Sequence, residues 1–107
     1  MEALPTINSA IAPSCALDAD GMRRQAERYR RAGAGATLLA RTPRRLALRV
    51  RPEAQAEVTE AVAIERECCP FYEIDWDPST GELSFAVGRA EDEPALEAIA
   101  AAFGLRQ

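Results

Sequence analysis

Three stretches of the chain alternate between apolar and polar residues with a period of two. The clearest is RLALRVR at residues 45–51, and the others are residues 71–76 and 82–88. Such alternation is typical of a strand with one buried and one solvent-exposed face. ATLLART at residues 36–42 precedes the first stretch across a proline, and a DPSTG turn separates the other two. The sequence therefore predicts two β-hairpins.

Helical spacing of apolar residues predicts a first helix ahead of these hairpins. It would begin at a cap formed by Asp18 or Asp20, and Gly33 would end it. Its apolar face would consist of Met22, Ala26 and Tyr29. Arginines occupy most of the remaining surface of this helix.

Two further helices each follow a hairpin. One would start at Pro52 and end before Pro70, because a proline pushes the preceding residue out of the helical region. The other would start at Asp92 or Glu93 and close at Gly104. Their inner faces would carry Ala54, Val58, Ala61, Val62 and Ile64, and Leu96, Ile99, Ala100 and Phe103, respectively.

The resulting order, α-β-β-α-β-β-α, predicts an α+β two-layer sandwich with a mainly antiparallel four-stranded sheet. A flexible tail over residues 1–14 would precede a single domain over residues 15–107. Residues 36–69 and 71–103 each predict a hairpin followed by a helix, so the body would be a repeat of two ββα units. The first helix would cover part of the other sheet face, or that face would form the interface of a homodimer.

Charge divides the chain into two unequal halves. Residues 1–51 have a balance of +6 and residues 52–107 a balance of −10, within a net charge of −4. The halves would neutralise each other on folding or across a dimer, or the basic half would bind an anionic partner. If neighbouring strands carry Arg45, Arg49 and Arg51 opposite Glu73 and Asp75, cross-strand ion pairs would absorb the imbalance. The acidic pI and the scarcity of aromatic residues among the arginines argue against nucleic-acid binding.

Two residue types are absent, and their absence excludes several kinds of site. The chain has no histidine, which excludes Cys-His and Ser-His catalysis and histidine-bearing zinc sites. All 13 basic residues are arginine, so Schiff-base chemistry on a lysine is also excluded. The apolar runs are too short to span a membrane, and the N-terminal residues do not have the pattern of a secretory signal. We therefore expect a cytoplasmic protein, in a compartment that keeps thiols reduced.

The remaining candidate chemistry is that of Cys15, Cys68 and Cys69. Soft ions such as Hg(II), Cu(I), As(III) or Cd(II) bind well to two or three thiolates. The three cysteines would supply such a metal site if the segment before the first helix lies near the end of the middle helix. A structural zinc ion normally takes four ligands, so zinc would need a carboxylate such as Glu65 or a second chain.

Two other interpretations of the cysteines compete with metal binding. Cysteine is among the most buried residue types, and the spacing also suits plain packing in the core. Alternatively, a disulfide between Cys15 and either Cys68 or Cys69 would make the protein a thiol-redox device. Against the redox interpretation, a helix C-terminus disfavours a thiolate, and only Arg66 offers a positive charge nearby.

The stretch Glu65-Arg66-Glu67-Cys68-Cys69-Pro70-Phe71 resembles the E-R-x-C-C-P-F signature of a family of short bacterial proteins. A cysteine before an arginine-bearing first helix and a strand hairpin after the signature also resemble that family. The resemblance implies an association with mercury-resistance or other metal-resistance contexts, without implying a mechanism. At residues 72–73, Tyr-Glu stands where the relatives often have more apolar or basic residues.

We therefore expect a small protein that sequesters or transfers a soft metal or metalloid ion through Cys15, Cys68 and Cys69. The alternative is a non-enzymatic interaction or dimerisation protein with buried structural cysteines, and the third hypothesis is the thiol-redox protein. An enzyme is less well supported. Cleavage of a carbon–mercury bond would need two thiolates and an acid, for which Glu65 or Asp75 is a candidate.

Overall fold

Four antiparallel strands form one sheet in the computed structural model, which describes residues 18–105. The strands are β1 (Thr37–Thr42), β2 (Arg45–Arg49), β3 (Glu73–Asp77) and β4 (Glu82–Ala86). Their order in the sheet is β1-β2-β4-β3, so the two hairpins join through the pairing of β2 with β4. Both predicted hairpins and the antiparallel sheet are confirmed.

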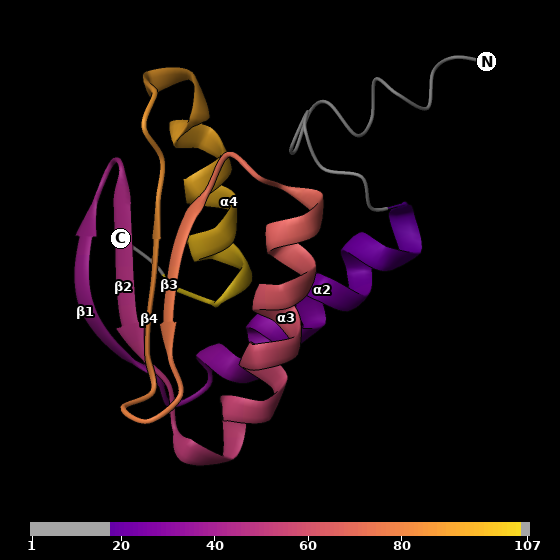
Figure 1. Cartoon of the computed structure of the whole chain (residues 1–107), viewed down its shortest axis with the longest axis vertical. Coiled ribbons are helices and arrows are strands. Elements are labelled where there is room, and N and C mark those ends of the chain that lie inside the picture. The colour runs from indigo at the N-terminus through magenta and orange to yellow at the C-terminus, as the bar shows by residue number, and fades with distance from the viewer. Residues whose placement is uncertain (1–17, 106–107) are drawn as a thin grey trace.

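Three helices lie together on one face of this sheet (Figure 1). They are α2 (Ala19–Gly33), α3 (Gln55–Cys68) and α4 (Glu93–Ala102). Short 3-10 turns, η1 (Pro52–Ala54) and η2 (Ala90–Asp92), introduce α3 and α4. The element order and the α+β two-layer sandwich predicted from the sequence are therefore confirmed. Within residues 18–105, no helix covers the opposite face of the sheet (Figure 1).

The sequence alternative that placed the first helix over that opposite face is wrong. Helix α2 packs on α3 and α4, and the ring of Tyr29 lies 4.8 Å from that of Phe103 and 6.0 Å from that of Phe85. At its start, the side chain of Asp18 accepts the backbone N–H of Gly21 over 2.7 Å, as expected of an N-cap. The helix thereby forms part of the same core as the sheet.

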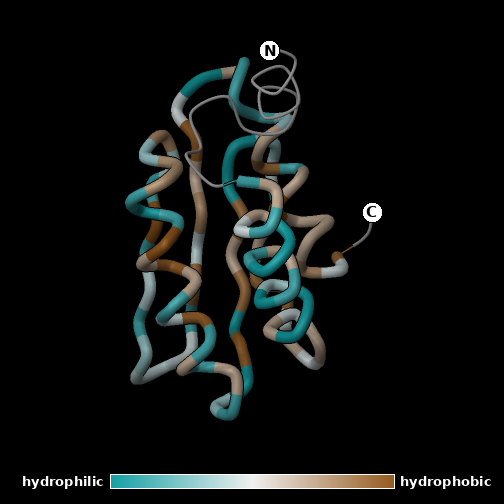
Figure 2. The backbone as a smooth tube through the Cα atoms, turned by 90° about the vertical axis from the view of Figure 1, so that its right-hand side faces the viewer, coloured by the Kyte–Doolittle hydropathy of each residue, from teal (hydrophilic) through white to brown (hydrophobic). Residues whose placement is uncertain are grey.

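Alternating strand residues and the helix faces enclose one hydrophobic core. Its largest fully buried side chains are Phe85, Leu46, Leu48, Leu83, Val58, Val62 and Cys69. Figure 2 shows hydrophilic and hydrophobic residues alternating along the helices, which is the pattern of elements that turn one face towards a core. The inner faces predicted for β2, β4 and α4 are confirmed.

Of the three residues predicted to form the apolar face of the first helix, only Tyr29 is buried. The buried residues of α2 are Gly21, Gln25, Tyr29 and Ala32, whereas Ala26 is exposed and Met22 only half-buried. The physical reason is that Gln25 is buried by satisfying its polar atoms inside the protein. Hydropathy alone assigns a glutamine to the surface.

The remaining domain predictions meet the structure only in part. The predicted tail over residues 1–14 and Cys15 lie outside the described residues. The repeat of two ββα units stays a prediction, although β2 and β4, the second strands of the two hairpins, are central neighbours in the sheet. Among residues 18–105, every helix is too short or too polar to cross a bilayer.

Candidate functional site

The two adjacent cysteines lie at the corner where α3 gives way to the chain leading into β3. Cys68 is the last residue of α3, and Cys69 is its C-cap with φ −135° and ψ 72°. The backbone N–H of Cys69 still donates to the carbonyl of Glu65 over 2.7 Å. Because Pro70 has no N–H and disfavours a helical residue before it, the helix cannot continue beyond this point. The predicted helix-to-strand corner at the cysteines is confirmed.

The two sulfur-bearing side chains have different surroundings. Cys69 is 1% exposed and belongs to the hydrophobic core, whereas Cys68 is half-buried at the edge of that core. The change of backbone direction at Cys69 is what separates them. Cys68 thus has access to solvent, and Cys69 would need local opening of the corner before its sulfur met a large reagent.

Arg66 is held next to the corner by the first residues of β3. One guanidinium nitrogen donates to the backbone carbonyl of Ile74 over 2.9 Å. This bond connects the end of α3 to β3 and directs the positive charge along the strand. The sequence identified Arg66 as the nearest cation to the cysteines, and in the structure its charged end also serves a backbone acceptor.

One turn before the cysteines, the side chain of Glu65 is buried, with 5% exposure. Its Oε1 accepts the hydroxyl of Tyr29 over 2.5 Å and the amide nitrogen of Gln25 over 3.0 Å. The same Gln25 amide nitrogen lies 2.8 Å from the carbonyl oxygen of Ala61. Three buried polar side chains therefore join α2 to α3. We call Gln25, Tyr29 and Glu65 the interior polar network.

Burial and the neighbouring charge of Glu65 both act on Tyr29. Loss of solvent is the larger cause that raises the pKa of the Tyr29 hydroxyl well above its usual value, and the charge and hydrogen bond of Glu65 raise it further. Tyr29 therefore remains a neutral donor over the whole physiological range. At the rim, Arg28 donates to the Oε1 of Gln25 over 3.0 Å, so the amide is used on both sides.

The interior polar network was not predicted from the sequence. A signal was present, because Glu65 continues the buried stripe of α3 at four residues beyond Ala61 and seven beyond Val58. A carboxyl group on a core stripe requires donors. In the same way, Gln25 precedes Tyr29 by one helical turn on the buried side of α2. No rule of sequence spacing pairs these two helices, so the partners become visible only in the fold.

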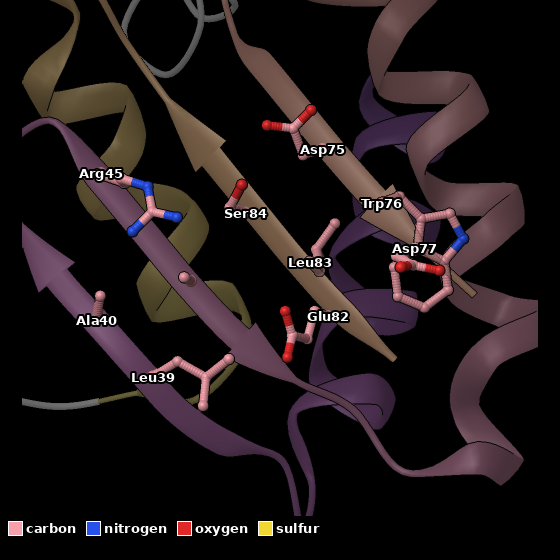
Figure 3. A pocket seen from close by; sticks show the side chains of 10 residues that line it. Leu39, Ala40, Arg45, Asp75, Trp76, Asp77, Glu82, Leu83 and Ser84 are labelled. Atoms are coloured by element: carbon pink, nitrogen blue, oxygen red, sulfur yellow. The ribbon is translucent and has the colours of Figure 1, made fainter. Parts of the chain in front are cut away.

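The network bears on the roles considered for the two acids. One oxygen of Glu65 already accepts two hydrogen bonds inside the protein, which makes a metal-ligand role costly. Asp75 lies on β3 paired with Ser84 and faces away from the helices (Figure 3). Cys69, in contrast, is buried in the hydrophobic core. The expectation that Asp75 could serve as an acid beside the thiols therefore does not fit this sheet.

The predicted three-cysteine site is described only in part. Cys68 and Cys69 are adjacent at the corner, and Cys15 lies outside the described residues. Within residues 18–105, no group of three or more cysteine and acidic side chains is arranged to hold a metal ion. A site with three or more such ligands would accordingly need one from beyond that range or from a second copy.

Ion pairs across the molecule connect the basic half to the acidic half. Among residues 18–105, the pairs between side chains of the two halves are Arg28–Glu60, Arg31–Glu57, Arg41–Glu97, Arg44–Glu93, Arg49–Glu82 and Arg51–Glu53. The strands carrying Arg45 and Asp75 are separated by β4, so the condition for cross-strand pairing between them is not met. Only Arg49 and Glu82, 2.8 Å apart, form an ion pair across neighbouring strands in the described part of the chain.

The comparisons with known proteins leave the site to be argued from its own residues. No family model, no curated protein and no solved structure matches this chain.

Proposed function

We propose that this chain binds a soft metal or metalloid ion through cysteine thiolates, with Cys68 and Cys69 as two ligands and Cys15 as the third. The proposal rests on one observation, which is that two consecutive thiols lie at a helix end, one half-buried and one in the core. A soft ion held by Cys69 would be shielded from solvent, and Cys68 would be the point of entry. We further propose that the protein acts in the cytoplasm and sequesters or transfers the ion without transforming it.

The position of the thiols favours a metal ligand over a redox nucleophile. The C-terminal end of a helix carries a partial negative charge, which disfavours a bare thiolate. A bound cation brings its own positive charge and displaces the thiol proton, so the helix end opposes metal binding much less. Because the core side of the corner is apolar, binding would favour ions that accept soft sulfur ligands without water.

The burial of Cys69 also favours a second function, in which the cysteines bind no ion. At 1% exposure, Cys69 fills space in the core as an ordinary small apolar side chain does. Under this alternative the cysteines are structural, and the protein acts as an interaction or dimerisation module through its charged surfaces. The two functions differ in whether the native fold allows an ion to reach the sulfurs.

The test is a titration of the reduced, full-length protein with Hg(II) and As(III) under anaerobic conditions. Monothiol competitor is present throughout, because any single thiol binds Hg(II). We expect one ion per chain, with the loss of all reactive thiols in a single step and a sulfur-to-metal absorption band. Cys15→Ser, Cys68→Ser and Cys69→Ser should each weaken retention of the ion against the competitor.

The opposite outcome is equally definite. If the folded wild-type chain retains neither ion against the monothiol, and its thiols react only after denaturant is added, the structural interpretation holds. If Cys68→Ser and Cys69→Ser lose the ion but Cys15→Ser retains it fully, the site has two sulfur ligands and Cys15 is not part of it. Circular dichroism of each variant confirms that folding is retained.

A further inference from the structure

The sheet face that points away from the helices carries a regular arrangement of outward side chains. We call it the outer face, and Figure 3 looks onto it with the helices behind the sheet. On β2, Arg45 and Arg49 point outward and are exposed, whereas Leu46 and Leu48 between them are buried on the helical side. The antiparallel register assigns the residues of the other strands to the same side.

The register arranges the outer face in three rows across the sheet. The rows are Thr42–Arg45–Ala86–Glu73, Ala40–Ala47–Ser84–Asp75 and Thr37–Arg49–Glu82–Asp77. Basic side chains lie on the β2 side of the sheet, and the acidic ones on β4 and β3. In the middle row, the side chains on β1, β2 and β4 are small, and only Asp75 on the edge strand β3 is larger (Figure 3). The face therefore has a basic half, a shallow centre and an acidic half.

Charges on this face are less well paired than those elsewhere. Arg49 binds Glu82, but no ion pair among residues 18–105 includes Arg45, Glu73 or Asp75. Arg45 and Glu73 belong to the same row and lie on either side of Ala86, so β4 keeps them apart by about two strand spacings, roughly 9.6 Å. The two side chains form no ion pair with each other in the structure, and they flank the small side chain of Ala86.

We propose that the outer face is the interface of a homodimer, in which two copies pack sheet against sheet around a two-fold axis parallel to the strands. With this axis, each row of one copy faces the same row of the other copy. The order of the strands across the second sheet is the reverse of that in the first. β2 of one copy then lies opposite β4 of the other, and the basic half of each copy meets the acidic half of its counterpart. Arg45 would lie opposite Ala86 of the second copy and beside its Glu73.

The small side chains make this contact sterically feasible. In the middle row Ala47 would face Ser84 of the second copy, so the two sheets can approach to the usual separation of about 10 Å. A two-fold axis perpendicular to the strands would instead place β2 opposite β2 of the other copy. The arginines of the two copies would then repel each other. The side chains of residues 1–17 include one acid and no basic residue.

The area of the outer face determines the dimer affinity that we expect. Four strands of about five residues cover an area of roughly 19 by 17 Å. This is small beside the ~800 Å² per partner that a standard interface buries. Charge complementarity would therefore provide specificity, and the dimer should have a Kd in the micromolar range.

The experiment is sedimentation equilibrium of the full-length protein over a concentration series spanning the micromolar range. We expect reversible dimerisation that weakens as salt is added. Arg45→Glu should raise the Kd at least tenfold, and Glu73→Arg should do the same, because each variant brings like charges together. The double variant Arg45→Glu/Glu73→Arg should recover most of the wild-type affinity, since the charge pattern is then reversed and remains complementary.

The matched control is Arg24→Glu, which makes the same charge change on an exposed position of α2, on the helical side. It should leave the Kd within twofold of the wild-type value. Ser84→Arg places a long side chain in the shallow centre and should abolish the dimer while the circular dichroism spectrum stays native. A wild-type chain that is monomeric at every concentration, or a double variant as weak as either single one, would overturn the proposal.

Discussion

The hydroxyl of Tyr29 and the Oε1 of Glu65 lie 2.5 Å apart in the interior, and this hydrogen bond joins α2 to α3 through two residues that are 36 positions apart in sequence. Their alignment is further fixed by Gln25, which donates to the same oxygen. Buried polar groups are costly unless each has a partner, so the network favours the observed arrangement of α2 on α3. Packing of small apolar residues alone would permit the helices to slide.

Removal of the Tyr29 hydroxyl should destabilise the fold. Tyr29→Phe keeps the ring contacts with Phe85 and Phe103 but deprives Glu65 of a donor in a buried position. A hydrogen bond to a charged group contributes about 1.5–3 kcal/mol, and we expect the free energy of unfolding to fall by an amount in that range. Urea denaturation followed by circular dichroism measures it.

The control for this prediction is Glu67→Gln, which changes an exposed glutamate on α3 outside the interior polar network. It should alter the free energy of unfolding by no more than about 0.5 kcal/mol, as surface substitutions usually do. A double-mutant cycle of Tyr29→Phe with Glu65→Gln should give a favourable coupling energy between the two residues. Additive effects in that cycle would contradict the inferred role of the hydrogen bond.

Alkaline pH should lower the free energy of unfolding through ionisation of Tyr29. The folded-state pKa of Tyr29 is raised, chiefly by burial, above its unfolded-state value of about 10. Its contribution to stability is therefore fully present below pH 10 or so, and it is lost progressively as the pH rises above that value. Denaturation curves measured on either side of this point should show a steeper alkaline loss of stability for wild type than for Tyr29→Phe. Equal slopes would contradict the prediction.

Much of the fold follows from local sequence patterns. The alternation around Leu46 and Leu48, the cap at Asp18 and the break at Pro70 each act within a few residues, and all three predicted the observed structure. The order of strands in the sheet was a different problem. Pairing of β2 with β4 depends on which hydrophobic faces meet across 30 residues or more, and no local pattern encodes it.

For the candidate site, the sequence predicted the backbone conformation but not the surroundings of the side chains. Spacing placed Cys68 and Cys69 at a helix end, but their unequal burial depends on how the corner packs against the core. The role of Glu65 was missed because its donors come from another helix. Hydropathy assigns glutamine and glutamate to solvent, whereas in the fold the Gln25 amide donates to the Glu65 carboxylate inside the protein.

The turn before β4 should be intolerant of a side chain at Gly81. This glycine has φ +79°, and a Cβ there would lie 2.7 Å from the carbonyl oxygen of Val50. Gly81→Ala therefore combines left-handed backbone strain of about 1–2 kcal/mol with a steric clash against backbone. We expect the free energy of unfolding to fall by at least that strain, as measured by urea denaturation.

Gly88→Ala supplies the matched comparison for the turn. Gly88 does not have a positive φ, and nothing lies within 4 Å of a Cβ built there. Its replacement should leave stability unchanged or raise it slightly, by up to about 1 kcal/mol, because alanine restricts the unfolded chain more than glycine does. Equal destabilisation by the two substitutions would mean that the turn at Gly81 is not held in the described conformation.

The ion pair between Arg31 and Glu57 should be visible as a shifted titration. Nε of Arg31 lies 2.8 Å from Oε2 of Glu57, and hydrogen bonding by the guanidinium lowers the pKa of that carboxyl group. For a lowered carboxyl pKa, the contribution to stability is present above the unfolded-state value of about 4.3 and is lost as the pH falls through the folded-state pKa. Arg31→Gln should therefore move the NMR titration midpoint of Glu57 upward. Arg24→Gln, which removes an arginine from the same helix without touching this pair, should leave the midpoint in place, and a similar shift in both variants would show that helix charge rather than the Arg31 contact sets the pKa.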